Sequence, residues 1–164
     1  MANTNAPYGY RLWSRLTGGE GSPLVPVLVK VSSAVTLKVQ DPMKMSLGLG
    51  YLATGTNAIF GIVNSPVPGW SETATAVHYP DIIPADDQSV FRVQSIGTVN
   101  ATAGYIRSDY KYRIGGTTSG YTGVDLSKHT TGSITVLGLA PGSAFGTYAE
   151  LLVTISRGQF VGQV

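Results

Sequence analysis

Apolar and polar residues alternate with a period of two in several short segments of the chain, and this alternation is typical of β-strands. The clearest segments are residues 89–96, 110–114 and 150–156. One face of these segments carries Phe91 and Val93, Tyr110, Tyr112 and Ile114, and Leu151, Val153 and Ile155, respectively. The other face carries polar residues, such as Arg92 and Gln94 in the first segment. We therefore predict that each segment is a strand with one face toward a core.

Shorter apolar or β-branched runs extend this pattern over much of the chain. They span residues 24–31, 35–39, 58–63 and 133–139. Pro26 confines the first run to a sheet edge or a bulge, because proline lacks the N–H that an interior strand must donate. No window of roughly 11–18 residues that is free of Gly and Pro carries the apolar spacing of a helix. About eight or nine short strands predict a single all-β domain, either a β-barrel or a β-sandwich.

Three segments do not fit a compact β-domain. They are residues 1–22, which end in a Gly-rich stretch, residues 64–70 with two prolines, and the polar stretch 115–132. A connection as long as the last one is uncommon inside a domain. We predict that residues 1–22 form an extended N-terminal arm and that residues 23–164 form the domain. The alternative is that residues 1–16 are simply the first strand of the same domain.

The chain contains few charged residues, and this low content favours some classes of binding partner over others. Charged residues make up only 12% of the chain, about half of the usual ~25%. Surfaces that carry little charge are often those that neighbouring proteins cover. The net charge of +2 is too small to indicate nucleic acid as a main partner. The absence of cysteine excludes disulfides and thiolate metal ligands.

The charges that are present are unevenly distributed. Residues 1–40 contain four Lys and Arg residues and one Glu, a balance of 4 − 1 = +3. Residues 70–91 contain Glu72, Asp81, Asp86 and Asp87 and no basic residue, a balance of −4. Copies of such a chain could pair head to tail, although an acidic loop in solvent explains the second stretch equally well.

Neither a secretion signal nor a membrane helix is expected. The first five residues are polar and contain no apolar core. No apolar run approaches the ~18 residues that a membrane-spanning helix needs. The expectation is a protein that is made in a cytoplasm and has no membrane partner.

The residues that support catalysis or metal binding form no recognisable motif. The chain has two histidines, His78 and His129, and no G-x-S-x-G nucleophile motif. The cluster Asp81, Asp86 and Asp87 lacks the spacing of a calcium loop, and Pro84–Asp87 is typical of a turn. The Gly-rich residues 115–120 lack the Lys-Ser/Thr ending of a phosphate-binding loop. We therefore expect no enzymatic activity, no catalytic or metal site and no cofactor.

The aromatic residues leave a second class of function open. The chain has nine tyrosines and two tryptophans, which could form a platform for stacking against sugars. Four of the tyrosines are close in sequence, namely Tyr105, Tyr110, Tyr112 and Tyr121. Packing in a core or an interface is the commoner use of such residues. A carbohydrate-binding, host-attachment module is therefore kept as the alternative.

Several sequence blocks together resemble a group of small phage structural proteins of the capsid decoration, or cement, type. In chain order, the blocks are residues 5–11 (NAPYGYR), 40–44 (QDPMK), 60–63 (FGIV), 83–94 (IPADDQSVFRVQ), 116–126 (GTTSGYTGVDL), 137–139 (LGL) and 149–155 (AELLVTI). They occur in the family's order and cover most of the chain. The chain departs from the family pattern at Gln40, which replaces glycine, at Arg92, which replaces an acidic residue, and in residues 157–160. These departures affect the exact contact residues.

The resemblance implies a virion protein on the outer surface of a phage head. Such a protein binds the major capsid protein at junctions of the shell, stabilises the head and often forms a homotrimer. The resemblance does not separate a head protein from a tail structural protein of similar build. The partner-binding residues that we predict lie in the expected arm: Tyr8, Tyr10 and Trp13 as aromatic anchors, and Arg11 and Arg15 as partners of acidic groups on the shell.

Overall fold

The computed structural model describes residues 3–4, 8–16, 25–26, 30–31, 37–47, 49–65, 81–86, 88–101, 112–116, 122–126, 132–156 and 158–159. Within these ranges the chain is all-β, with fourteen strands. The strands are β1 (Arg11–Arg15), β2 (Val25–Pro26), β3 (Lys30–Val31), β4 (Pro42–Ser46), β5 (Leu49–Leu52), β6 (Gly61–Val63), β7 (Asp81–Pro84), β8 (Ser89–Ile96), β9 (Thr98–Val99), β10 (Arg113–Gly116), β11 (Thr122–Asp125), β12 (Ile134–Leu139), β13 (Gly146–Thr147) and β14 (Glu150–Ile155). No helix in the described part of the chain is long and apolar enough to cross a membrane.

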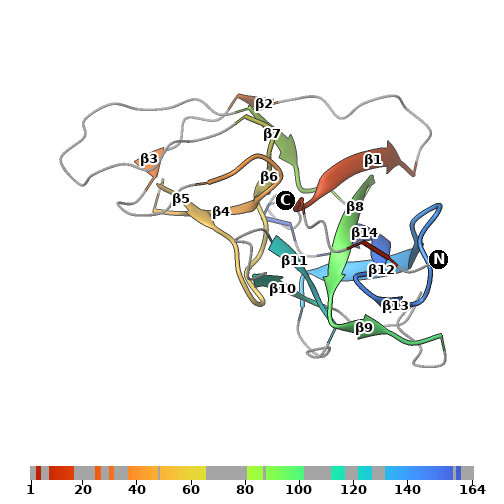
Figure 1. Ribbon diagram of the computed structural model, residues 1–164. Coiled ribbons are helices and arrows are strands. Elements are labelled where there is room, and N and C mark those ends of the chain that lie inside the picture. The colour runs from red at the N-terminus through yellow and green to blue at the C-terminus, as the bar shows by residue number, and fades with distance from the viewer. Residues whose placement is uncertain are drawn as a thin grey trace.

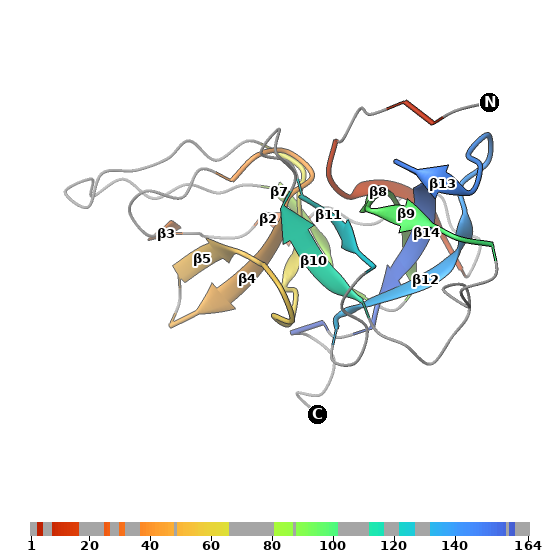
Figure 2. The ribbon, with the colours of Figure 1, turned by 60° about the horizontal axis from the view of Figure 1, so that its bottom comes forward.

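The first sheet is built around β8, the longest strand. Its order is β10-β11-β8-β14-β12, and β1 also pairs with β8, which makes six strands (Figure 1). The antiparallel strand β14 occupies one edge of β8. The other edge is shared, because β1 pairs with Ser89–Arg92 and β11 pairs in parallel with Ser95 and Ile96. The short pair β9 and β13 lies beside β14 (Figure 2).

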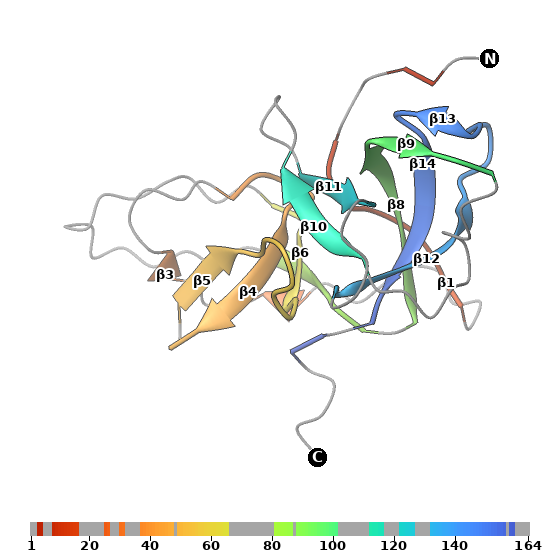
Figure 3. The ribbon, with the colours of Figure 1, turned by 90° about the horizontal axis from the view of Figure 1, so that it is seen from below.

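The second sheet also has six strands, in the order β2-β7-β6-β4-β5-β3. Its centre is antiparallel, and only β3 pairs in parallel, with β5. Strands β10 and β11 lie between this sheet and the rest of the first sheet (Figures 2 and 3). The described strands form open, sandwich-like sheets and no closed barrel, which confirms the predicted all-β class.

The two sheets share one hydrophobic core. Phe91 and Leu151 of the first sheet belong to the same buried cluster as Ile62 and Ile83 of the second. A smaller cluster around Leu37 and Met43 lies within the second sheet. Burial of these apolar side chains, at about 25 cal/mol per Å², is the main force that holds the sheets together.

A buried carboxylate reinforces the junction between the sheets. Asp41 is 3% exposed and accepts hydrogen bonds from the Lys38 backbone N–H (2.8 Å) and from the Thr122 hydroxyl of β11 (3.3 Å). The adjacent Gln40 carbonyl accepts a hydrogen bond from the Tyr10 N–H at 2.8 Å. The turn before β4 is therefore fastened both to β11 and to the segment that leads into β1.

Most of the predicted strands are present. Strands β8, β12 and β14 match the predicted segments, with Phe91, Val93, Leu151, Val153 and Ile155 buried in the core. Pro26 lies in β2, an edge strand of its sheet. The predicted strand 35–39 is wrong at its end, since Lys38–Asp41 forms a turn, and the polar stretch 115–132 contains β11.

The expected N-terminal arm is incorrect for residues 8–16, and the alternative that we kept open describes them. Residues 11–15 are β1, which pairs with β8 of the same chain, and the Leu16 N–H donates to the Gln88 carbonyl at 2.8 Å. Tyr10 is fully buried in the core that both sheets share. The predicted boundary at residue 22 lies outside the described residues.

Candidate partner-binding face

Thr4 and Tyr8 contact the face of β8 and β14 that points away from the core. This outer face carries Arg92, Gln94 and Glu150, whereas Phe91 and Val93 point into the core. The Gln94 side-chain amide donates to the Thr4 carbonyl at 2.9 Å. Figure 1 shows residues 3–4, in dark red, passing in front of this part of the sheet. Residues far apart in sequence therefore share one surface.

A half-buried cluster of polar side chains fixes this segment in place. Arg92 donates to Glu150 through Nε, at 2.7 Å, and also through Nη2. The Tyr8 hydroxyl donates to the other carboxylate oxygen of Glu150 at 3.1 Å. Burial, and secondarily the charge of Glu150, raises the pKa of Tyr8 to about 12. The hydrogen bond to Glu150 raises the pKa of Arg92, so Tyr8 stays neutral and Arg92 stays charged at physiological pH.

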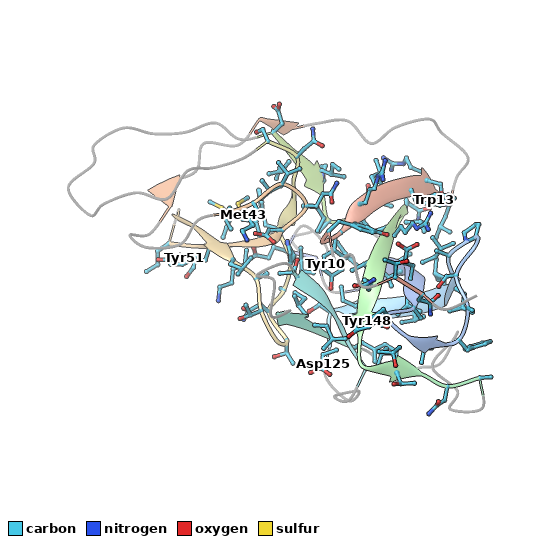
Figure 4. All side chains as sticks on the ribbon, in the orientation of Figure 1. Tyr10, Trp13, Met43, Tyr51, Asp125 and Tyr148 are labelled. Carbon is cyan, nitrogen blue, oxygen red and sulfur yellow. The ribbon has the colours of Figure 1, made fainter. Side chains whose placement is uncertain are left out.

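Trp13 covers this cluster. The Arg92 guanidinium lies over the Trp13 ring, with Cζ 5.4 Å from the ring centroid, which is within the range of a cation–π contact. The register of β1 against β8 shifts between Leu12 and Ser14, so Trp13 occupies an irregularity that redirects a side chain. Trp13 is nevertheless 46% exposed. An aromatic ring is thus fixed in position while half of its surface remains in solvent (Figure 4).

A neighbouring loop adds two exposed aromatic residues, Phe145 and Tyr148. The Asn3 side chain fastens this loop, because its Nδ2 donates to the carbonyls of Ala144 (2.9 Å) and Thr147 (3.1 Å). Tyr148 has a positive φ of 60°, a conformation that costs a non-glycine residue energy. These two residues were missed in the sequence, since neither lies in an alternating run or near the N-terminus.

The five predicted partner-binding residues separate into three groups. Tyr8 and Trp13 meet at the Arg92–Glu150 pair on the outer face. Arg11 is exposed, and Arg15 forms an ion pair with Asp86 at 3.1 Å. Tyr10 cannot be an anchor for a partner, because its ring is fully buried and its hydroxyl donates to the Gly123 carbonyl at 3.2 Å.

The structure describes only part of the other candidate sites, namely the acidic cluster, the tyrosines and the histidines. Asp86 has a structural role of the kind expected in a turn, since it accepts hydrogen bonds from the Ser89 N–H at 2.7 Å and from Arg15. No group of three potential metal ligands occurs in the ranges that the structure describes. Tyr112 of the proposed sugar platform is buried in the core. The two histidines, Asp87, Tyr105, Tyr110 and Tyr121 lie outside the described residues.

The charges of the outer face suit association with another protein. Arg92 and Glu150 already pair with each other, so covering them with a partner would leave neither charge unpaired. Exposed aromatic residues around a neutralised centre match the composition of protein interfaces. Comparison with protein-family models, with curated proteins and with solved structures found no match. The functional interpretation therefore rests on the residues themselves.

Proposed function

We propose that the protein is a capsid decoration protein, which binds the outer surface of a phage head through the outer face of β1, β8 and β14. The observation that carries the proposal is the fixed, half-exposed Trp13 above the Arg92–Glu150 pair. Tryptophan and arginine are the residues that most often dominate the binding energy of interfaces. The ordered sequence blocks that resemble decoration proteins support the same function.

The surrounding surface supports a protein partner. Leu16, which is exposed, directly follows β1 and lies three positions after Trp13 in the sequence. Arg11 forms no ion pair with any other described residue, so it is available to an acidic group of the shell. The partner in this proposal is the major capsid protein, and acidic side chains around an apolar pocket are the chemistry that would fit this face.

Because a capsid shell repeats the same binding site many times, each single contact can be weak and the protein can still bind firmly. A decoration protein meets many identical sites, and a homotrimer would engage several of them at once. The second and third contacts are then intramolecular, with an effective concentration in the millimolar range for short connections. Stabilisation of the head follows by mass action, because a ligand that binds only the assembled shell opposes its disassembly.

Binding to empty heads lacking this protein tests the proposal. The variant Trp13→Ala should weaken co-sedimentation with heads by about 30-fold or more per contact, which corresponds to about 2 kcal/mol. Trp13→Phe should restore part of the binding, since it keeps an apolar ring over Arg92. Asn64→Ala, at an exposed position directly after β6, is the matched control.

Two results would contradict the proposed function. One is failure of the wild-type protein to bind heads or to raise their temperature of disassembly. The other is unchanged binding by Trp13→Ala. Urea unfolding of each variant shows whether a loss of binding reflects loss of the fold, and Trp13→Ala should remain folded because the ring is half in solvent. Sugar-dependent binding to cells instead of heads would favour the host-attachment alternative.

A further inference from the structure

The side chain of Asn3 occupies a polar site in the loop between β12 and β14. Its amide pairs with both backbone groups of Ala144, because Nδ2 donates to the Ala144 carbonyl at 2.9 Å and the Ala144 N–H donates to Oδ1 at 3.1 Å. Nδ2 also donates to the Thr147 carbonyl at 3.1 Å, and the Ser143 hydroxyl donates to Oδ1 at 3.4 Å. One side chain therefore uses its donors and its acceptor on a loop whose Ala144 is 141 positions away.

The conformation of this loop depends on these contacts. Its own strand, β13, is two residues long and pairs with β9, which is equally short. An isolated pair of strands is only marginally stable in water. Without the Asn3 amide, the N–H and the carbonyl of Ala144 and the carbonyl of Thr147 lose these hydrogen bonds. Local opening of the loop then costs less free energy.

The two carbonyls that Asn3 binds stand directly before the two exposed aromatic residues of the loop. Ala144 precedes Phe145, which is 45% exposed, and Thr147 precedes Tyr148, which is 38% exposed. Asn3 thus fixes the backbone next to each ring while both rings remain in contact with solvent.

The same loop is joined to the outer face that carries Trp13. The Gln94 side-chain amide, which binds the Thr4 carbonyl, also donates to the Tyr148 carbonyl at 3.4 Å. Gln94 and Arg92 are two positions apart on β8 and point to the same side, and Arg92 lies under Trp13. The loop aromatic residues and Trp13 therefore flank neighbouring outer positions of one strand.

A second connection runs through Ser143. Its hydroxyl donates to Asn3 and accepts a hydrogen bond from the Glu150 N–H at 2.9 Å. The carboxylate of Glu150 binds Arg92, the residue under the Trp13 ring. Asn3 is thus linked to both parts of the outer face, although it was not among the residues predicted from the sequence.

We propose that Asn3 is a positioning residue for partner binding, which holds the loop so that Phe145 and Tyr148 extend the contact surface beside Trp13. This inference rests on the proposed function. Side chains that are already held in place lose less entropy when a partner covers them. A change at Asn3 therefore weakens binding through the loop and not through a contact of its own.

Hydrogen exchange of the free protein tests whether Asn3 holds the loop. In Asn3→Ala, amide exchange in the peptide 141–149 should accelerate by about 10-fold or more, while exchange in β12 stays unchanged. Asn3→Asp keeps an acceptor for the Ala144 N–H but places a carboxylate oxygen against two carbonyls, so it should accelerate exchange as well. Asn64→Ala, the same change at an exposed position after β6, is the matched control. Unchanged exchange in the loop of Asn3→Ala would overturn the inference, whatever the protein binds.

A double-mutant cycle on empty heads tests whether the loop is what matters for binding. Asn3→Ala alone should lower the affinity by about 10-fold, which corresponds to about 1.4 kcal/mol. In a variant that already carries Phe145→Ala and Tyr148→Ala, the same change should have no further effect, because the side chains that Asn3 positions are absent. A loss of binding that is equal in both backgrounds would overturn the inference.

The remaining outcomes separate this inference from the proposed function. If Trp13→Ala weakens head binding and Asn3→Ala does not, the inference is refuted while the proposed function stands. If wild-type protein does not bind heads at all, the proposed function fails, and the role of Asn3 in binding fails with it. If Asn3→Ala instead yields a smaller oligomer in sedimentation, Asn3 joins copies of the chain and the inference is overturned.

Discussion

Truncation of Tyr10 gives the sharpest test of the N-terminal segment as part of the fold. If residues 8–16 belonged to a detachable arm, replacing this tyrosine would leave the stability of the free protein unchanged. In the structure its ring is fully buried among residues of both sheets, and its hydroxyl donates to the Gly123 carbonyl of β11. The variants Tyr10→Phe and Tyr10→Ala separate the hydrogen bond from the packing.

The expected magnitudes follow from these contacts. Tyr10→Phe removes one hydrogen bond between neutral groups and should lower the free energy of unfolding by about 1 kcal/mol. Tyr10→Ala also removes the buried ring and leaves a cavity at the junction of the sheets, which should cost about 3–5 kcal/mol. For a chain of this length, such a loss corresponds to a fall in the thermal midpoint of roughly 10 °C or more.

Urea unfolding followed by tryptophan fluorescence measures these differences. Arg11→Ala is the control, because Arg11 is the next residue and its side chain is exposed. This control should change stability by less than about 0.5 kcal/mol. A loss below about 1 kcal/mol for Tyr10→Ala would refute the placement of Tyr10 in the core and would return residues 8–16 to the role of an arm.

Two further predictions concern the junction that Tyr10 joins. Gly9→Ala should lower the free energy of unfolding by several kcal/mol in urea unfolding. The reason is that Gly9 has a φ of 83° and that a Cβ there would lie 2.6 Å from the Gln40 carbonyl oxygen. A loss no larger than that of Arg11→Ala would contradict this close approach. Burial raises the pKa of Asp41 above its usual 3.8, so the folded state binds this proton more tightly than the unfolded state. The contribution of Asp41 to stability is then fully present below pH 3.8 and is lost as the pH rises through the higher folded pKa. The asparagine of Asp41→Asn can still accept the hydrogen bond from the Lys38 N–H. The free energy of unfolding of this variant, relative to that of the wild type, should therefore increase between pH 4 and pH 7. A difference in free energy that does not change with pH would exclude the raised pKa of Asp41.

The strands that the sequence predicted best are those whose two faces differ most. Strands β8 and β14 have a core face of large apolar residues and an outer face with Arg92, Gln94 and Glu150, so alternation located them. Strands β4 and β5 were missed, because the segment 42–52 contains two glycines and a lysine, and few β-branched residues. Strand β11 was assigned to a polar loop, since Thr122, Gly123 and Asp125 lack the apolar alternation of a strand, and only the pairing with β10 and β8 places them in the sheet.

The candidate face was predictable only in part. Trp13 stood out as an aromatic residue among arginines near the N-terminus. Its support could not be predicted, because Arg92 and Glu150 are 58 positions apart and meet only through the pairing of β8 with β14.

The motif Tyr8-Gly9-Tyr10 shows how one conformational detail separates structure from function. In a continuous strand, residues two positions apart lie on the same face, so both tyrosines would be expected to contact one surface. Gly9 adopts a φ of 83°, and this turn sends Tyr10 into the core and Tyr8 to Glu150 on the outer face. The glycine thereby makes one tyrosine part of the fold and leaves the other to position the Arg92–Glu150 pair under Trp13. A partner that binds Trp13 would consequently contact a surface that Tyr10 anchors in the core between the two sheets.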